Sequence, residues 1–415
     1  MMKRQLRLLP MVAAASGVLV LAACSSSGSS APSSGTSAAA AANAGNFTGP
    51  DIAVGVMRPV NAGLSYPDGF AAAQVAADAI NAAGGVKGHK LVVDTCDDKD
   101  DPNVAASCAD TLINHDHVVA MAGTFSRQAD ALYPDLTKAG AADFCNNAIA
   151  PKEFADPLSF PCAGGIAAIL NVKLATQGKN YKSAAYVTYG DATGQVTYGF
   201  AQQAFAAAGI TDVQKLTITD TQVDVSPLAA KLEANPPDVF SSGITDPLNV
   251  KLMQTLASSG KKTPLIITSG SNGDLMTNGA AQAGYPITTI AAFGYGTATF
   301  KNYLDQVAKY GNGTVHNIYE DPTFIAWLGV TLFAKTAATL PSITPAAFTA
   351  ALKKGPLQTG ATPPISWAQP GPLKDFPRLT NVYGTTATLQ GTKWVQNSPF
   401  GTGIPGAPPP SSQPS

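Results

Sequence analysis

Residues 80–102 constrain the fold more than any other part of this sequence. They read INAAGGVKGHKLVVDTCDDKDDP. Adjacent glycines such as Gly84 and Gly85 are typical of a helix end, because glycine adopts left-handed backbone conformations without steric cost. The apolar run at 91–95 then predicts a strand, and Pro102 after Asp101 is typical of a capped helix start. The segment therefore predicts helix, turn, strand, loop and helix, which is the repeating unit of a parallel α/β sheet.

The remaining chain repeats this alternation in two series. The first predicts strands at 52–56, 118–122 and 141–144, with helices at 69–81, where Asp68 is the expected N-cap, and 102–114. The second series predicts helices at 165–177, from Gly194 to about 208, and at 247–258, and a further helix that begins at Ser226. Its predicted strands lie at 184–189, 216–218, 239–241 and 265–268. Late helices are expected at 323–339 and 344–354, followed by a hairpin at 376–395 around Gln390 and Gly391. About 350 residues of this pattern suit two α/β domains better than one core.

The N-terminus has the pattern of a bacterial export signal. Lys3, Arg4 and Arg7 precede an apolar stretch at 8–23, which is short for a membrane span. Its end, LAAC at 21–24, is typical of a lipobox, in which the thiol of Cys24 receives a lipid. Ordinary cleavage after Ala23 is the alternative. We therefore predict a signal peptide at 1–23, a flexible Ser/Ala/Gly tether at 24–47, and a membrane anchor through the lipid.

The composition of the chain limits the kinds of partner that it is expected to bind. The net charge is −1 and 13% of residues are charged, so nothing favours nucleic acid or an acidic lipid surface. Apolar residues make up 45% of the chain, which is ample for two cores. Residues 401–415 are rich in Pro and Ser, and we expect them to be disordered.

The segment at 80–102 closely resembles a characteristic segment of the type I periplasmic binding proteins, the branched-chain amino-acid (leucine-binding-like) receptors of ABC importers. The pattern positions are Asn81, Gly84, Gly85, Gly88, Asp98 and Pro102. The segments at 186–210, which begins YVTYGDATG and ends AFAAAGI, and at 236–270, which begins PPDVFSSG, resemble the second lobe of the same family. The resemblance implies two Rossmann-like parallel-sheet lobes joined by a three-strand hinge. It places lobe 1 at 48–163 and 291–363, and lobe 2 at 164–290 and 364–400.

Ligands of open α/β sheets bind beyond the carboxyl ends of the strands. In the first lobe this rule selects Tyr66 after the first strand and the loop Thr124, Phe125, Ser126 and Arg127 after the third. In the resembled family that loop holds a ligand carboxylate, and free amides at a helix N-terminus favour an anion. A solvated arginine and a simple helix cap are the alternatives. Asn146, Asn147 and Ala148 follow the fourth strand, where the two asparagines depart from the family's small hydroxyl residues.

In the second lobe the same rule selects Tyr189, Thr193, Asp246, Ser271 and Asn272. Thr193 stands where the family often has an aromatic residue, so a leucine-type contact is in doubt. Asp246 could bind an ammonium group, or it could cap the helix that begins at Pro247. Tyr295 and Tyr319 are predicted to line the site near the hinge, with a place in the core as their alternative.

Four cysteines remain after export, and three pairings are possible. Cys96 ends a strand and Cys108 lies on the following helix; some members of the resembled family have an equivalent bridge. Cys145 and Cys162 bracket a loop. We predict these two disulfides, with free buried thiols as the alternative.

The sequence contains no nucleophile elbow, zinc-protease or P-loop motif, so no enzyme activity and no cofactor are expected. His115 and His117 flank Asp116 without a further ligand in sequence, and the acidic loop at 97–101 lacks the glycine of a calcium loop. No metal site is predicted. We therefore expect a monomeric, lipid-anchored solute-binding protein on the outer face of the cytoplasmic membrane. It would bind a small polar solute and pass it to an ABC permease and ATPase. The alternatives are a ligand-sensing lipoprotein of the same fold that feeds a signalling system, and a non-transport enzyme or envelope lipoprotein on this scaffold.

Overall fold

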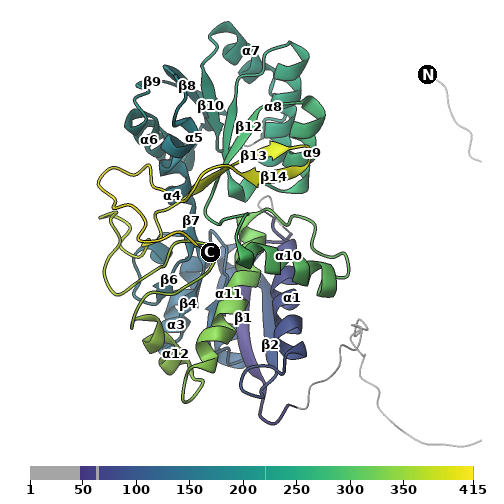
Figure 1. The fold of residues 1–415 in the computed structure, drawn as a ribbon, viewed down its shortest axis with the longest axis vertical. Coiled ribbons are helices and arrows are strands. Elements are labelled where there is room, and N and C mark those ends of the chain that lie inside the picture. Colours follow the sequence, from purple (N-terminus) through teal and green to yellow (C-terminus); the bar gives the residue numbers. More distant parts are fainter. Residues whose placement is uncertain (1–46, 62–64, 220, 415) are drawn as a thin grey trace, which may run out of the picture. The chain divides into compact units, whose positions relative to one another are not determined.

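The computed structural model describes residues 47–61, 65–219 and 221–414, with the backbone alone at 192 and 193. These residues form two main sheets covered by helices (Figure 1). The first sheet has the order β2-β1-β3-β4-β6, and the second has the order β14-β13-β12-β11-β10-β8-β9. Every neighbouring pair is parallel except β12–β13 and β13–β14. The predicted α/β class with two parallel sheets is confirmed.

The first sheet is built from the N-terminal series of elements. β1 and β2 pair in register from Ile52 with Leu91 to Arg58 with Asp97. The small strands β5 and β7 pair separately beside the sheet. The bounds are β1 Ile52–Arg58, α1 Asp68–Ala82, β2 Leu91–Asp97, α2 Pro102–Ala109 with a π-helical turn Asp110–His115, β3 Met121–Ala122, α3 Tyr133–Ala139, β4 Asp143–Phe144, β5 Asn147–Ala148, β6 Ser159–Phe160 and β7 Ala163–Gly164.

The second sheet follows in the chain and is closed at one edge by the C-terminal hairpin. Its parallel strands alternate with helices, as the sequence predicts. The bounds are α4 Gly165–Leu170, α5 Val172–Thr176, β8 Ser183–Tyr189, α6 Ala192–Ala207, β9 Asp212–Ile218, α7 Ser226–Ala234, β10 Val239–Ser242, α8 Asp246–Ser258, β11 Leu265–Thr268, α9 Asp274–Ala283, β12 Ile287–Ala291, β13 Thr385–Gln390 and β14 Lys393–Gln396. Between β12 and β13 the chain returns to the first sheet, where α10 (Ala298–Tyr310) packs against α1.

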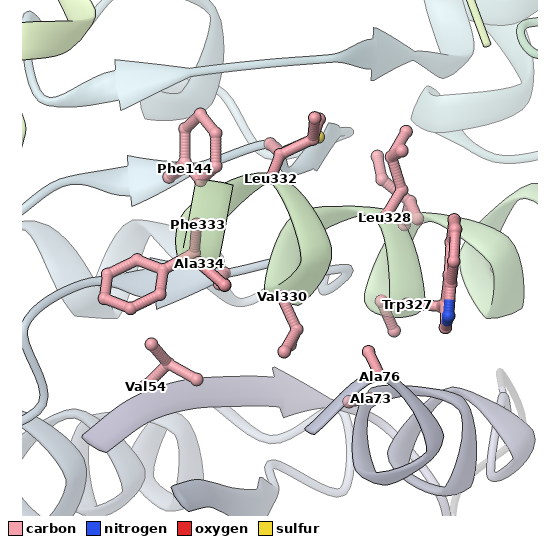
Figure 2. Close-up of a cluster of buried hydrophobic side chains, with 14 of the residues drawn as sticks. Val54, Ala73, Ala76, Phe144, Trp327, Leu328, Val330, Leu332, Phe333 and Ala334 are labelled. Atoms are coloured by element: carbon pink, nitrogen blue, oxygen red, sulfur yellow. The ribbon is translucent and has the colours of Figure 1, made fainter. Parts of the chain in front are cut away.

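α11 (Asp321–Ala338) returns the chain to the core of the first sheet, and α12 (Pro345–Leu352) follows it. Most residues of α11 are buried on all sides, as expected for a helix without a polar face. Figure 2 shows its side chains between Val54 of β1, Phe144 of β4 and the small residues Ala73 and Ala76 of α1. The two alanines let α1 approach α11 closely.

Two predictions about local structure are corrected, and three elements were not predicted. Asp68 lies inside the first turn of α1, where its carboxylate accepts hydrogen bonds from the backbone N–H groups of His316 (2.7 Å) and Asn317 (2.6 Å) rather than capping the helix. The helix predicted at 165–177 is broken at Asn171 into α4 and α5, because the Asn171 side chain bonds the backbone of Val382 and Gly403. The sequence also gave no signal for α9, β12 and α10.

The C-terminal segment differs from the predicted disordered tail. Gly401 donates to the carbonyl of Gly384 (2.9 Å), and Ile404 is buried. The Gln413 side chain accepts from the backbone N–H of Phe400 (2.7 Å) and donates to its carbonyl (2.9 Å). Long-range partners therefore order a stretch whose composition alone predicts disorder.

Several predictions fall outside the described residues. The signal peptide, the lipidation at Cys24 and nearly all of the tether lie within residues 1–46. In the part of the chain that the structure describes, no helix combines the length and apolar character needed to span a bilayer.

Both predicted disulfides are present. Cys96 and Cys108 join the end of β2 to α2 with a Cα–Cα distance of 5.6 Å. Cys145 and Cys162 join the loop after β4 to the segment before β7 at 4.5 Å. Asp101 also caps α2 as predicted, accepting from the N–H groups of Asn103 and Val104.

Replacing Cys96 and Cys108 together by alanine should lower the free energy of unfolding by about 3 kcal/mol, because the bridge restricts the unfolded chain. Urea unfolding of the oxidised wild type and the double variant measures this difference. Peptide mapping without reductant should recover Cys96 linked to Cys108; a free thiol at either position would contradict the assignment.

Candidate functional site

Loops from the carboxyl ends of both sheets meet at Tyr66. Its hydroxyl donates to the carbonyl of Gly270, which follows β11, at 3.4 Å. Burial raises the pKa of Tyr66 well above its ordinary value, and the charges of Glu320 and Asp246 add to this, while Arg127 opposes them. The predicted residues Tyr66, Arg127 and Asp246 therefore lie within one electrostatic neighbourhood, although they come from different sheets. Phe125 packs edge-on against the Tyr66 ring, with 4.8 Å between the ring centroids.

Arg58, which the sequence analysis did not select, holds the loop after β3. Its side chain is fully buried and donates to the carbonyls of Gly123 (2.9 Å) and Pro322 (2.7 Å). Burial lowers its pKa to about 10, against the opposing charges of Glu320 and Asp98. Gly123 has φ +76°, and a Cβ there would lie 2.7 Å from the Cα of Ala326. Only glycine allows this close approach between the loop and α11.

The groups predicted to bind a ligand carboxylate are engaged with neighbouring acids. The buried hydroxyl of Ser126 donates to Asp98 and accepts from the N–H of Gln128 (2.9 Å). Arg127 is half exposed and forms an ion pair with Asp100. Burial raises the pKa of Asp98 to about 6, although the bond from Ser126 lowers it. A solute carboxylate at this loop would therefore compete with Asp98 and Asp100.

The loop after β4 is joined to the loop after β3. The backbone N–H of Asn147 donates to the carbonyl of Thr124 at 3.0 Å, and Asn147 and Ala148 pair with β7. Asn146 is fully buried, and its amide donates to Glu153 at 2.8 Å. The structure thus brings the predicted residues of these two loops together, but the Asn146 side chain is turned into the protein.

In the second sheet the loops that carry the predicted residues contact one another. Tyr189, at the end of β8, accepts a bond from the N–H of Thr245 (3.2 Å). Thr245 is the N-cap of α8, so the alternative reading of Asp246 as the cap is wrong. Burial raises the pKa of Asp246 to about 6, and a hydrogen bond from Ser271 lowers it. The side chain of Thr193 lies outside the described part of the chain.

The predicted residues Tyr295 and Tyr319 pack against the core and also support the loop after β11. The amide of Asn272 donates to the Tyr295 hydroxyl (2.6 Å), which donates to the carbonyl of Tyr319 (3.0 Å). The two tyrosine rings pack with 5.4 Å between centroids. This chain of bonds ties the loop after β11 to the segment that enters α11.

Two adjacent acids at that segment were missed from the sequence. Glu320 is the N-cap residue of α11, and burial, followed by the charges of Asp246 and Asp68, raises its pKa well above its usual value. Asp321 accepts a bond from the hydroxyl of Ser269 and from the N–H of Ala292 (3.4 Å). Acids before a proline are typical of a helix start, so Glu320 and Asp321 could not be distinguished from ordinary capping residues.

Within the described ranges, no cluster of three or more His, Cys, Asp or Glu side chains has a metal-binding arrangement. His115 instead lies 3.3 Å from Asp110 on the same turn. A pocket of about 520 Å³ lies beside the C-terminal segment and is lined by residues 296–297, 396–400 and 413–414, none of which is a predicted ligand residue.

Two parallel sheets whose strand-end loops face one another define a two-lobed solute-binding architecture. The family model "Periplasmic binding protein" matches residues 51–374, and the chain belongs to this family of solute-binding proteins. No curated protein sequence matches the chain.

Solved structures share the fold at low sequence identity. A possible leucine/isoleucine/valine-binding protein from Rhodopirellula baltica has a TM-score of 0.69 at 12% identity, covering 86% of this chain and 98% of its own. LivJ from Streptococcus pneumoniae, in complex with isoleucine, has a TM-score of 0.66 at 20% identity (84% and 100%). A solute-binding protein from R. palustris, in complex with benzoate, has a TM-score of 0.64 at 17% identity (86% and 97%). These similarities confirm the type I fold.

Burial raises the pKa of Asp321 to about 7. A carboxyl group with a raised pKa binds its proton more tightly when folded, so its contribution to stability is complete below a pH of about 4. That contribution, roughly 4 kcal/mol, is lost as the pH rises through about 7. Asp321→Asn should therefore make the free energy of unfolding fall less steeply between pH 5 and pH 8. Urea unfolding at both pH values checks this, and equal pH dependence in the two proteins would contradict it.

Proposed function

We propose that the protein is the extracytoplasmic solute-binding component of an ABC importer. It closes two lobes around a small polar solute, which is an amino acid, an amide or a small carboxylate. The observation that carries this proposal is the meeting of strand-end loops from both sheets at Tyr66, in a chain of the periplasmic binding protein family. Because no covalent chemistry is implied, binding and release are its whole activity.

The proposed ligand-binding residues come from both sheets. The loops after β3 and β4 supply donors for a carboxylate or amide, and Asp246 supplies an acceptor for an ammonium group. Isoleucine and benzoate, which the two relatives above hold, share a carboxylate and differ in the ammonium group. The proposed set is Tyr66, Thr124, Phe125, Ser126, Arg127, Asn147, Ala148, Tyr189, Thr193, Asp246, Ser271, Asn272, Tyr295 and Tyr319. Asn146 is left out because its side chain is turned inward to Glu153.

The proposed mechanism is hinge closure. A solute that contacts both sheets stabilises the closed arrangement, because only that arrangement lets both sets of loops reach it. The crossings near residues 163, 291 and 363 are the proposed hinge. Lipidation at Cys24 would hold the monomer on the outer face of the cytoplasmic membrane, beside its permease and ATPase.

Replacing Ser126 and Arg127 together by alanine should weaken carboxylate binding about tenfold, the loss of roughly 1.4 kcal/mol expected for a charge-assisted contact. A thermal-shift screen of amino acids, amides and small organic acids finds the solute, and calorimetry measures its affinity. Lys301→Ala removes a comparable exposed ion pair, with Asp305, on α10 and serves as the control. Unchanged affinity in the double variant would remove this loop from the site.

Asp246→Asn distinguishes an ammonium-bearing solute from a simple acid. The variant should lower the affinity for isoleucine about tenfold, because it removes the negative charge that would pair with the ammonium group. Benzoate affinity should be unchanged. Calorimetry with both compounds measures the difference, and equal effects on both would refute the assigned role of Asp246.

A further inference from the structure

The loop after β4 is folded around one buried carboxylate. Glu153, on the 3-10 turn Lys152–Phe154, is fully buried. One of its oxygens accepts from the backbone N–H groups of Ile149 (2.8 Å) and Ala150 (2.7 Å). The other accepts from the Asn146 amide at 2.8 Å. Three donors from one five-residue stretch therefore end on a single side chain.

Among the described residues, no lysine, arginine or histidine forms an ion pair with this side chain. Arg378 uses its Nε to donate to the carbonyl of Ser159 (2.7 Å). The charged neighbour of Glu153 is Asp143 of β4, which is also fully buried. The Asp143 carboxylate accepts a hydrogen bond from the Tyr133 hydroxyl (3.1 Å). Burial, and then the charge of Asp143, raises the pKa of Glu153 well above its ordinary value. Keeping an acid here costs stability, so core packing does not explain its presence.

The anchored stretch is the one proposed to face the solute. Asn147 and Ala148 lie between the two ends that Glu153 holds, and the N–H of Asn147 reaches the carbonyl of Thr124 in the neighbouring ligand loop. Cys145, which immediately precedes the stretch, has φ +51° and is held by its disulfide to Cys162. The disulfide fixes one end of the loop, whereas the far end at Ile149 and Ala150 depends on Glu153.

We propose that Glu153 is a positioning residue for solute binding: its carboxylate holds residues 146–150 in the shape that presents Asn147 and Ala148 to the solute. Glu153 itself does not touch the solute. This inference rests on the proposed solute-binding function.

Two substitutions separate the carboxylate's acceptors from its charge. Glu153→Ala removes all three acceptors. Glu153→Gln keeps an oxygen for Ile149 and Ala150 and places an amide N–H group beside Asn146. The Asn146 amide can then turn to accept from it with Oδ1, a buried atom that has no hydrogen-bond partner among the described residues. Leu232→Ala in α7 is the matched control, since it opens a buried site in the core of the other sheet.

Hydrogen exchange measures the loop, and calorimetry with isoleucine measures binding. In Glu153→Ala the amides of Ile149 and Ala150 should exchange at least tenfold faster, and isoleucine affinity should fall at least tenfold. Glu153→Gln should stay within about twofold of the wild type in both measurements. Leu232→Ala should lower the melting temperature and leave both readouts unchanged.

Wild-type protection of Ile149 and Ala150 in Glu153→Ala would overturn the proposal, as would equal losses of affinity in Glu153→Ala and Leu232→Ala. Failure of the wild type to bind isoleucine would count against the amino-acid part of the proposed function. The exchange rates would then still decide whether Glu153 holds the loop.

Discussion

The buried guanidinium of Arg58 is the contact on which the candidate site depends. It stands at the end of β1 and donates to the carbonyl of Gly123 and to that of Pro322, 264 positions further along the chain. These two bonds fix the start of the loop after β3 and the start of α11 to the same strand end. Because a buried charge without hydrogen bonds is costly, the two segments must keep these positions for the fold to persist.

The loops at the strand ends of both sheets are held by the same kind of hydrogen bond. In each, a serine that follows a central strand donates to a buried carboxylate: Ser126 to Asp98 beyond the first sheet, and Ser269 to Asp321 beyond the second. Burial raises the pKa of both acids. The strand-end loops are therefore shaped by polar contacts within the protein before any solute arrives, which favours a preorganised site.

Part of the site follows from the sequence, and part does not. The strand-end rule selected Tyr66 and Phe125, and the structure packs their rings together with the Tyr66 hydroxyl on the carbonyl of Gly270 beyond β11. The rule could not show that the Asn146 side chain turns inward to Glu153, because side-chain direction at the end of a short strand depends on its tertiary partners. It also missed Arg58, whose role comes from partners far away in sequence.

The sequence by itself determined what depends on neighbours in the chain: the β/α alternation, the cap at Asp101 and the local disulfide between Cys96 and Cys108. Short-range hydrogen bonds and backbone preferences suffice for these features. Only the tertiary structure decided that Asp68 bonds the backbone at residues 316 and 317, and that residues 401–414 are held by distant partners. Such contacts depend on burial and on the packing of segments that are distant in sequence, and local backbone preferences predict neither.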